Sequence, residues 1–66
     1  MYYDKMREVR KAKGLTQAKV AEALGISQQQ YFKYEKGINE FPLRYFIEFC
    51  KLTGSDPKEI LELNEP

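Results

Sequence analysis

The spacing of the glycines restricts the fold of this chain more than any other feature. The four glycines are Gly14, Gly25, Gly37 and Gly54. Glycine is favoured just after the last turn of a helix, because it adopts the left-handed backbone conformation without steric cost. The segments between these stops have helical length and lack the alternation of apolar and polar residues that indicates a strand. The sequence therefore predicts an all-α chain of short helices.

Residues that are typical of helix N-termini follow these glycines within a few positions. The hydroxyls of Thr16 and Ser27 accept hydrogen bonds from first-turn amides, and Pro42 and Pro57 suit a first turn. Five helices are predicted, over residues 4–13, 17–24, 28–36 and 42–53 and, last, a short one from residue 57. Apolar residues at helical spacing are expected to face inward, and they are Met6, Val9, Leu43, Phe46, Phe49, Cys50 and Leu52.

The length and the cysteine content exclude several classes of protein. Sixty-six residues are expected to form one domain, 1–66, with one modest core. Because Cys50 is the one cysteine and histidine is absent, neither an internal disulfide nor a Cys/His metal site is expected, and the thiol is predicted to be inert. No signal peptide or membrane-spanning run is recognisable, so a cytoplasmic location is expected. We also expect no enzyme activity, cofactor or small-molecule substrate.

Charge is divided unevenly along the chain, although the net charge is only +1. Residues 1–36 carry eight Lys or Arg against four acidic residues, a net charge of +4, whereas residues 37–66 carry three against six, a net charge of −3. This division is consistent with an amino-terminal half that faces a polyanion. The alternative is that these charges belong to ordinary solvated helix faces.

The predicted 28–36 helix has two chemically different sides. The short turn around Gly25 sets it at a steep angle to the preceding helix, so that it projects from the surface. With about 100° of rotation per residue, Ser27, Tyr31, Tyr34 and Glu35 share one side, and both tyrosines are expected in the core. The opposite side is rich in amides and positive charge, and it holds Gln29, Lys33 and Lys36, flanked by Gln28 and Phe32.

The outer side of this helix suits contacts with duplex DNA. A glutamine amide combines a donor and an acceptor, which matches the N6/N7 edge of adenine in the major groove. Lys33 suits guanine or a phosphate, and Phe32 suits a thymine methyl group. The alternative is that these side chains are ordinary surface residues.

Several motifs resemble those of a known family. The matching segments run from Met6 to Gln17, from Val20 to Ser27 and from Tyr34 to Gly37, together with Tyr31. The most specific are Gly14-Leu15-Thr16-Gln17 and Leu24-Gly25-Ile26-Ser27. In this pattern the chain resembles the lambda-repressor/Cro (XRE) family of helix-turn-helix proteins, without gaps as far as Leu61. The resemblance implies a five-helix lambda-repressor-like bundle, with the helix-turn-helix formed by the second and third helices.

The resemblance also implies roles for individual residues. Gln17 would contact a phosphate and support Gln28, while the second helix lies across the DNA backbone and the third enters the major groove. Arg10 and Glu35 would form a partly buried ion pair between the first and third helices. Together with candidates from the chain itself, the predicted DNA-binding residues are Gln17, Ser27, Gln28, Gln29, Phe32, Lys33, Lys36, Asn39 and Arg44.

The chain departs from the family pattern after Gly37, where basic residues are usual. Glu40 stands there instead, so fewer phosphate contacts are expected. Ile38 and Phe41 are expected to pack inward, and the alternative is that they contact a second subunit.

The resemblance favours a sequence-specific regulator, as a repressor, that binds a palindromic site in double-stranded DNA as a homodimer. Leu61 and Leu63 are candidate residues of its dimer surface. The alternative is a protein-interaction module of the same fold with weak DNA affinity, such as an antitoxin or an antirepressor partner.

Overall fold

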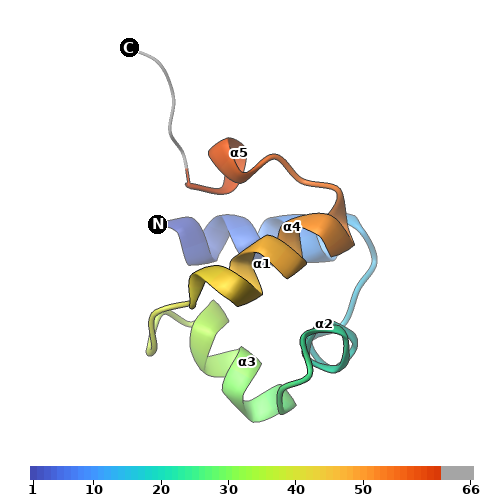
Figure 1. Cartoon of the computed structure of the whole chain (residues 1–66), viewed down its shortest axis with the longest axis vertical. Coiled ribbons are helices and arrows are strands. Elements are labelled where there is room, and N and C mark those ends of the chain that lie inside the picture. The colour runs from blue at the N-terminus through green and yellow to red at the C-terminus, as the bar shows by residue number, and fades with distance from the viewer. Residues whose placement is uncertain (62–66) are drawn as a thin grey trace.

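The computed structural model describes residues 1–61, and these residues form five helices and no strand (Figure 1). In chain order the helices are α1 (Tyr2–Ala12), α2 (Gln17–Leu24), α3 (Gln28–Glu35), α4 (Leu43–Thr53) and α5 (Pro57–Leu61). The helices α1 and α4 lie across the middle of the molecule, with α5 on one side of them and the α2–α3 pair on the other. The all-α prediction and the five predicted helices are therefore confirmed.

The helix boundaries differ from the predicted ones mainly at the amino terminus. The first helix begins at Tyr2 rather than at residue 4, because Met1 acts as its N-cap and the Asp4 amide donates to the Met1 carbonyl at 3.0 Å. Asp4 therefore lies inside the first turn, where its negative charge interacts favourably with the positive end of the helix dipole. Pro42 is the N-cap of α4 rather than its first residue.

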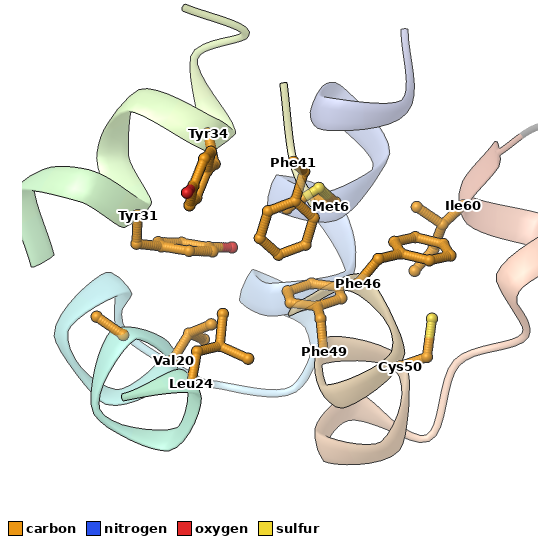
Figure 2. Close-up of a cluster of buried hydrophobic side chains, with 11 residues drawn as sticks. Met6, Val20, Leu24, Tyr31, Tyr34, Phe41, Phe46, Phe49, Cys50 and Ile60 are labelled. Carbon is orange, nitrogen blue, oxygen red and sulfur yellow. The ribbon is translucent and has the colours of Figure 1, made fainter. Parts of the chain in front are cut away.

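Buried side chains from all five helices form a single core, and Phe41 lies near its centre (Figure 2). Its ring centroid lies between 5.1 and 6.5 Å from those of five other aromatic side chains, which are Tyr31, Tyr34, Tyr45, Phe46 and Phe49. Phe41 comes from the loop before α4, so this loop contributes one side chain to the core, although residues 37–40 are exposed. The predicted burial of Phe41 and of both tyrosines is confirmed.

Two leucines of α4 were expected in the core and are not there. Leu43 is 70% exposed because it opens the helix beyond the edge of the core, and Leu52 is 40% exposed. Thr53 takes the inward position at that end, since it continues the line of Phe46, Phe49 and Cys50, and its hydroxyl donates to the Phe49 carbonyl at 2.9 Å.

The turn between α2 and α3 is built from local hydrogen bonds. Gly25 has φ +73°, and the Ile26 amide donates to the Ala21 carbonyl at 3.0 Å, which closes the end of α2. One residue later, the Ser27 hydroxyl accepts from the Gln30 amide at 3.0 Å and opens α3. The turn and the start of α3 lie at the end of the molecule opposite α5 (Figure 1).

The loop between α3 and α4 is held by the first residues of the chain. The Tyr2 hydroxyl accepts a hydrogen bond from the Phe41 amide at 3.1 Å, and the Tyr3 ring lies against Gly37. Ile38, which was expected to pack inward, is 64% exposed instead. Because Phe41 already fills the space between the aromatic rings, the core has no place for a second large side chain from this loop.

Candidate nucleic-acid interface

The helix α3 presents polar and basic side chains to solvent while its other side is fixed in the core. Tyr31, Tyr34 and Glu35 are buried. The opposite side contains exposed residues, which are Gln28, Gln29, Phe32 and Lys36, and the half-buried Lys33. The amides at the start of α3 are therefore accessible at a projecting end of the molecule.

A shared carboxylate fixes α3 against α1. Arg10 donates to both oxygens of Glu35, from Nε to Oε2 at 2.8 Å and from Nη2 to Oε1 at 3.0 Å. The Tyr31 hydroxyl donates to Oε2 at 2.6 Å. Arg10 Nη1 also donates to the Leu15 carbonyl at 2.8 Å, so the same guanidinium holds the turn before α2. The ion pair implied by the resemblance is thus formed between α1 and α3.

These contacts decide the charge state of the buried cluster. Burial alone would raise the pKa of Glu35, but hydrogen bonds from Arg10, Tyr31 and Gln17 outweigh it, and the pKa is lower than usual. The same hydrogen bond to Glu35 raises the pKa of Arg10. Burial, together with its bond to Glu35, raises the pKa of Tyr31. The cluster therefore consists of a carboxylate, a guanidinium and a neutral phenol at neutral pH.

Gln17 is engaged differently from what the resemblance implied. Its Nε2 donates to Glu35 Oε1 at 3.1 Å, whereas support of Gln28 was expected. A carboxylate is a stronger acceptor than a neutral amide, and Glu35 lies within reach. The first residue of α2 is therefore tied to the last residue of α3.

The remaining DNA-binding candidates are placed around α3 in different ways. The Lys36 ammonium lies 5.7 Å from the centroid of the Phe32 ring. The Asn39 amide donates to the Lys33 carbonyl at 3.3 Å, which places this loop residue at the end of α3. Arg44 instead stacks on its neighbour Tyr45, with its guanidinium carbon 4.5 Å from the ring centroid.

Two surface cavities lie beside these elements. A basic cavity of about 220 Å³ between α1, α2 and α3 is lined by Arg7, Arg10, Lys11, Gln17, Glu35 and Lys36. Arg7 and Lys11 were not among the predicted site residues. Their separation of four residues on the outer side of α1 was a usable indication, but it is also common on solvated helices.

A larger cavity is formed partly by the loop before α4. Its volume is about 490 Å³, and its lining residues are Tyr2, Glu40, Phe41, Pro42, Leu43, Phe46 and Leu61. Leu43 and Leu61 are exposed at its edge. Leu63, the other candidate for a dimer surface, lies outside the described residues.

Residues 1–61 contain no helix that is both long and apolar enough to cross a membrane. Over the same range, no three side chains of His, Cys, Asp or Glu are grouped closely enough to hold a metal ion.

A projecting helix joined by a tight turn to the helix before it, within a bundle of five short helices, defines a helix-turn-helix domain. A family model described as helix-turn-helix matches residues 6–60. The chain therefore belongs to this helix-turn-helix family, of the lambda-repressor/Cro (XRE) type.

A similar protein occurs in Pyrobaculum aerophilum, where it carries the name of a proposed HTH-type transcriptional regulatory protein. The two sequences are 29% identical over 62 residues, which cover 94% of this chain and 25% of the relative. The chain thus spans about a quarter of the length of the curated relative that it matches. No solved structure gives a significant match.

Proposed function

We propose that the chain is a sequence-specific DNA-binding transcriptional regulator, with α3 in the major groove and α2 across the phosphate backbone. The observation that carries this proposal is the exposure of Gln28 and Gln29 in the first turn of a helix whose opposite side is fixed by buried contacts. Membership of a helix-turn-helix family supports the same function.

The chemistry of the exposed side supports base recognition. In the major groove a glutamine amide pairs with the N6/N7 edge of adenine, and each bidentate contact contributes about 1–3 kcal/mol of discrimination. Phe32 is 40% exposed, enough to contact a thymine methyl group. Lys33 is available to guanine or to a phosphate, and Ser27, Lys36, Asn39 and Arg44 are proposed backbone contacts.

Rigid support of α3 is a second feature that favours DNA binding. The Glu35 carboxylate accepts hydrogen bonds from three side chains, which belong to α1, α2 and α3. Fixed helices lose little conformational freedom on binding, so the amides of the first turn are already placed for contact.

We propose that a homodimer binds a palindromic operator and acts as a repressor. A single domain of this size covers little DNA, and a two-fold dimer doubles its contacts across half-sites one helical turn apart, about 34–36 Å. The exposed Leu43 and Leu61, beside the larger cavity, are the apolar surface that a second copy would cover. Repression follows if the bound dimer excludes other proteins from the site.

The proposal is tested by selecting bound duplexes from a random pool. A sequence-specific dimer will enrich a palindrome with two half-sites one helical turn apart. Fluorescence anisotropy then measures affinity for the selected and for a random duplex at low and moderate salt. Failure to bind either duplex at micromolar protein and low salt would contradict the proposed function.

A second candidate function is a protein-interaction module that has kept the fold. The exposed Glu40 and the net charge of +1 favour it, because both weaken attraction to DNA. The anisotropy experiment separates the two candidates: a chain that binds no duplex but binds another protein is the interaction module.

A further inference from the structure

The basic cavity between α1, α2 and α3 has the size of a site for a small group. Its volume of about 220 Å³ is below the range of about 300–1,000 Å³ that is usual for cavities holding organic ligands. Three helices meet at it, and it includes the first residue of α2, where the positive end of the helix dipole lies.

The charge of this cavity favours an anion. Four of its six lining residues are cationic, and they are Arg7, Arg10, Lys11 and Lys36. The single lining carboxylate, Glu35, already accepts hydrogen bonds on both oxygens and is neutralised by Arg10. The positive charge around the cavity is therefore not cancelled from within it.

Few carboxylates compete for these cations. No acidic residue within the described range pairs with Lys11 or Lys36. Arg7 lies 3.6 Å from Asp4, but both side chains are about half exposed, and such surface pairs are weak. An incoming anion would therefore meet two free ammonium groups and one loosely held guanidinium.

Polar donors are also available beside the cations. Gln17 Nε2 carries two hydrogens, and Glu35 accepts one of them. Arg10 has five N–H groups, of which three are engaged, two by Glu35 and one by the Leu15 carbonyl. The amide and the guanidinium thus retain hydrogens for a second acceptor while they hold Glu35.

The position of Lys36 connects the cavity with the outer side of α3. Its ammonium lies 5.7 Å from the ring centroid of Phe32, a residue of the proposed base-contacting side, and Lys36 also lines the cavity. An anion in the cavity would accordingly lie next to a duplex bound by α3.

We propose that the cavity binds one phosphate of the DNA backbone, with Arg7 and Lys11 of α1 as phosphate contacts beside Gln17 and Lys36. The proposal rests on the proposed function and adds α1 to the DNA-binding surface. These contacts would compensate for the acidic Glu40 in the loop before α4, which repels phosphate.

The first test is the salt dependence of binding. Arg7→Gln and Lys11→Gln are compared with Lys51→Gln, an exposed lysine of α4 that does not line the cavity. The slope of log affinity against log salt is negative, and loss of one phosphate contact makes it shallower by about 0.9 for every sequence. Lys51→Gln is expected to keep the wild-type slope. Equal slopes for Lys11→Gln, Lys51→Gln and the wild type would overturn the proposal.

The second test locates the phosphate. Single neutral methylphosphonates are placed along the selected duplex, and affinity is measured for the wild type and for Lys11→Gln. One position is expected to weaken the wild type several-fold and the variant much less, because the variant has already lost that contact. If every position weakens both proteins equally, the cavity does not hold a backbone phosphate.

A third test separates this proposal from the proposed function. Inorganic phosphate is titrated into the free protein while the amide resonances of Gln17 and Lys36 are followed by NMR. Saturable shifts in the wild type that are reduced in Lys11→Gln support an anion site whether or not a duplex binds. The cavity proposal alone is overturned if phosphate causes no shifts, the duplex still binds, and Lys11→Gln has the same salt slope as the wild type.

Discussion

Gln17 and Glu35, the first residue of α2 and the last residue of α3, are joined by a hydrogen bond of 3.1 Å from the Gln17 side-chain amide to the Glu35 carboxylate. Arg10 holds the same carboxylate from α1. One buried charge therefore fixes the relative placement of the two helices of the helix-turn-helix and of the helix behind them.

Removing one member of the buried ion pair should cost far more than replacing both. In Arg10→Ala, Glu35 stays in the interior without its counter-charge, and the free energy of unfolding should fall by about 3–5 kcal/mol. In the double variant Arg10→Met, Glu35→Leu, no buried charge is left, and the loss should be much smaller. Urea unfolding of the wild type, the single variants Arg10→Met and Glu35→Leu, and the double variant gives the coupling between the residues.

The same variants should leave base discrimination largely intact. Arg10 touches none of the residues proposed to contact bases, so the ratio of affinities for selected and random duplexes should change little as long as the domain is folded. An Arg10→Ala protein with wild-type stability and altered base preference would contradict the structural role of the pair.

Acid should weaken the fold through Glu35. Its pKa is lower in the folded state than the usual value of about 4.3, so its ionisation stabilises the fold above that pH. This contribution is lost as the pH falls from about 4.3 through the lower folded-state pKa. The difference in unfolding free energy between wild type and Glu35→Gln should be constant near neutral pH and shrink in acid. Chemical unfolding across this range measures it.

Base contacts and backbone contacts should respond differently to truncation. Gln29→Ala should relax the preference at one base pair by about 1–3 kcal/mol and leave affinity for random DNA almost unchanged. Gln17→Ala should weaken binding to all sequences to a similar extent, because a phosphate contact carries no base information. Affinities for a set of single-base operator variants give both quantities. Unchanged affinity in both proteins would mean that another face binds DNA.

The parts of the fold that local chemistry determines were predictable. Gly25 and Ser27 form the turn through hydrogen bonds that span a few residues, and their identities alone define the end of α2 and the start of α3. The ion pair of Arg10 with Glu35 followed from the family resemblance, since two charged residues so far apart in the chain give no local indication that they meet.

The parts that depend on distant contacts were not predictable. The Tyr2 hydroxyl accepts a hydrogen bond from the amide of Phe41, 39 residues further along the chain, and the residues of α1 give no indication of this contact. Leu43 is more apolar than Thr53, yet the position of α4 exposes the leucine and buries the threonine. Hydrophobicity shows which side chains gain from burial, but the packing of the helices decides which of them find space.

Cys50 should react with thiol reagents only when the domain unfolds. The side chain is buried, with 7% of its surface exposed. Burial raises the pKa of the thiol, and the negative charge of Asp56 raises it further, so little thiolate is present near neutral pH. The labelling rate with a maleimide should therefore follow the unfolded population as urea is added. Rapid labelling of the native protein would show that the thiol is accessible.

Gly37 should tolerate a side chain less well than Gly25, although both have positive φ, at +79° and +73°. A Cβ at Gly25 has no heavy atom within 4 Å, so Gly25→Ala should cost only the backbone term of about 1–2 kcal/mol. A Cβ at Gly37 would lie 2.6 Å from the Tyr3 ring, which must then leave its place. Thermal unfolding should show a larger loss for Gly37→Ala than for Gly25→Ala.

The cause of this difference is separable by a second substitution. In a Tyr3→Ala background the ring is gone, and only the backbone cost remains at both glycines. The two Gly→Ala variants should then lower the melting temperature by similar amounts. If Gly37→Ala stays the more damaging of the two without the ring, contact with Tyr3 is not the reason, and the loop before α4 is restricted by its backbone alone.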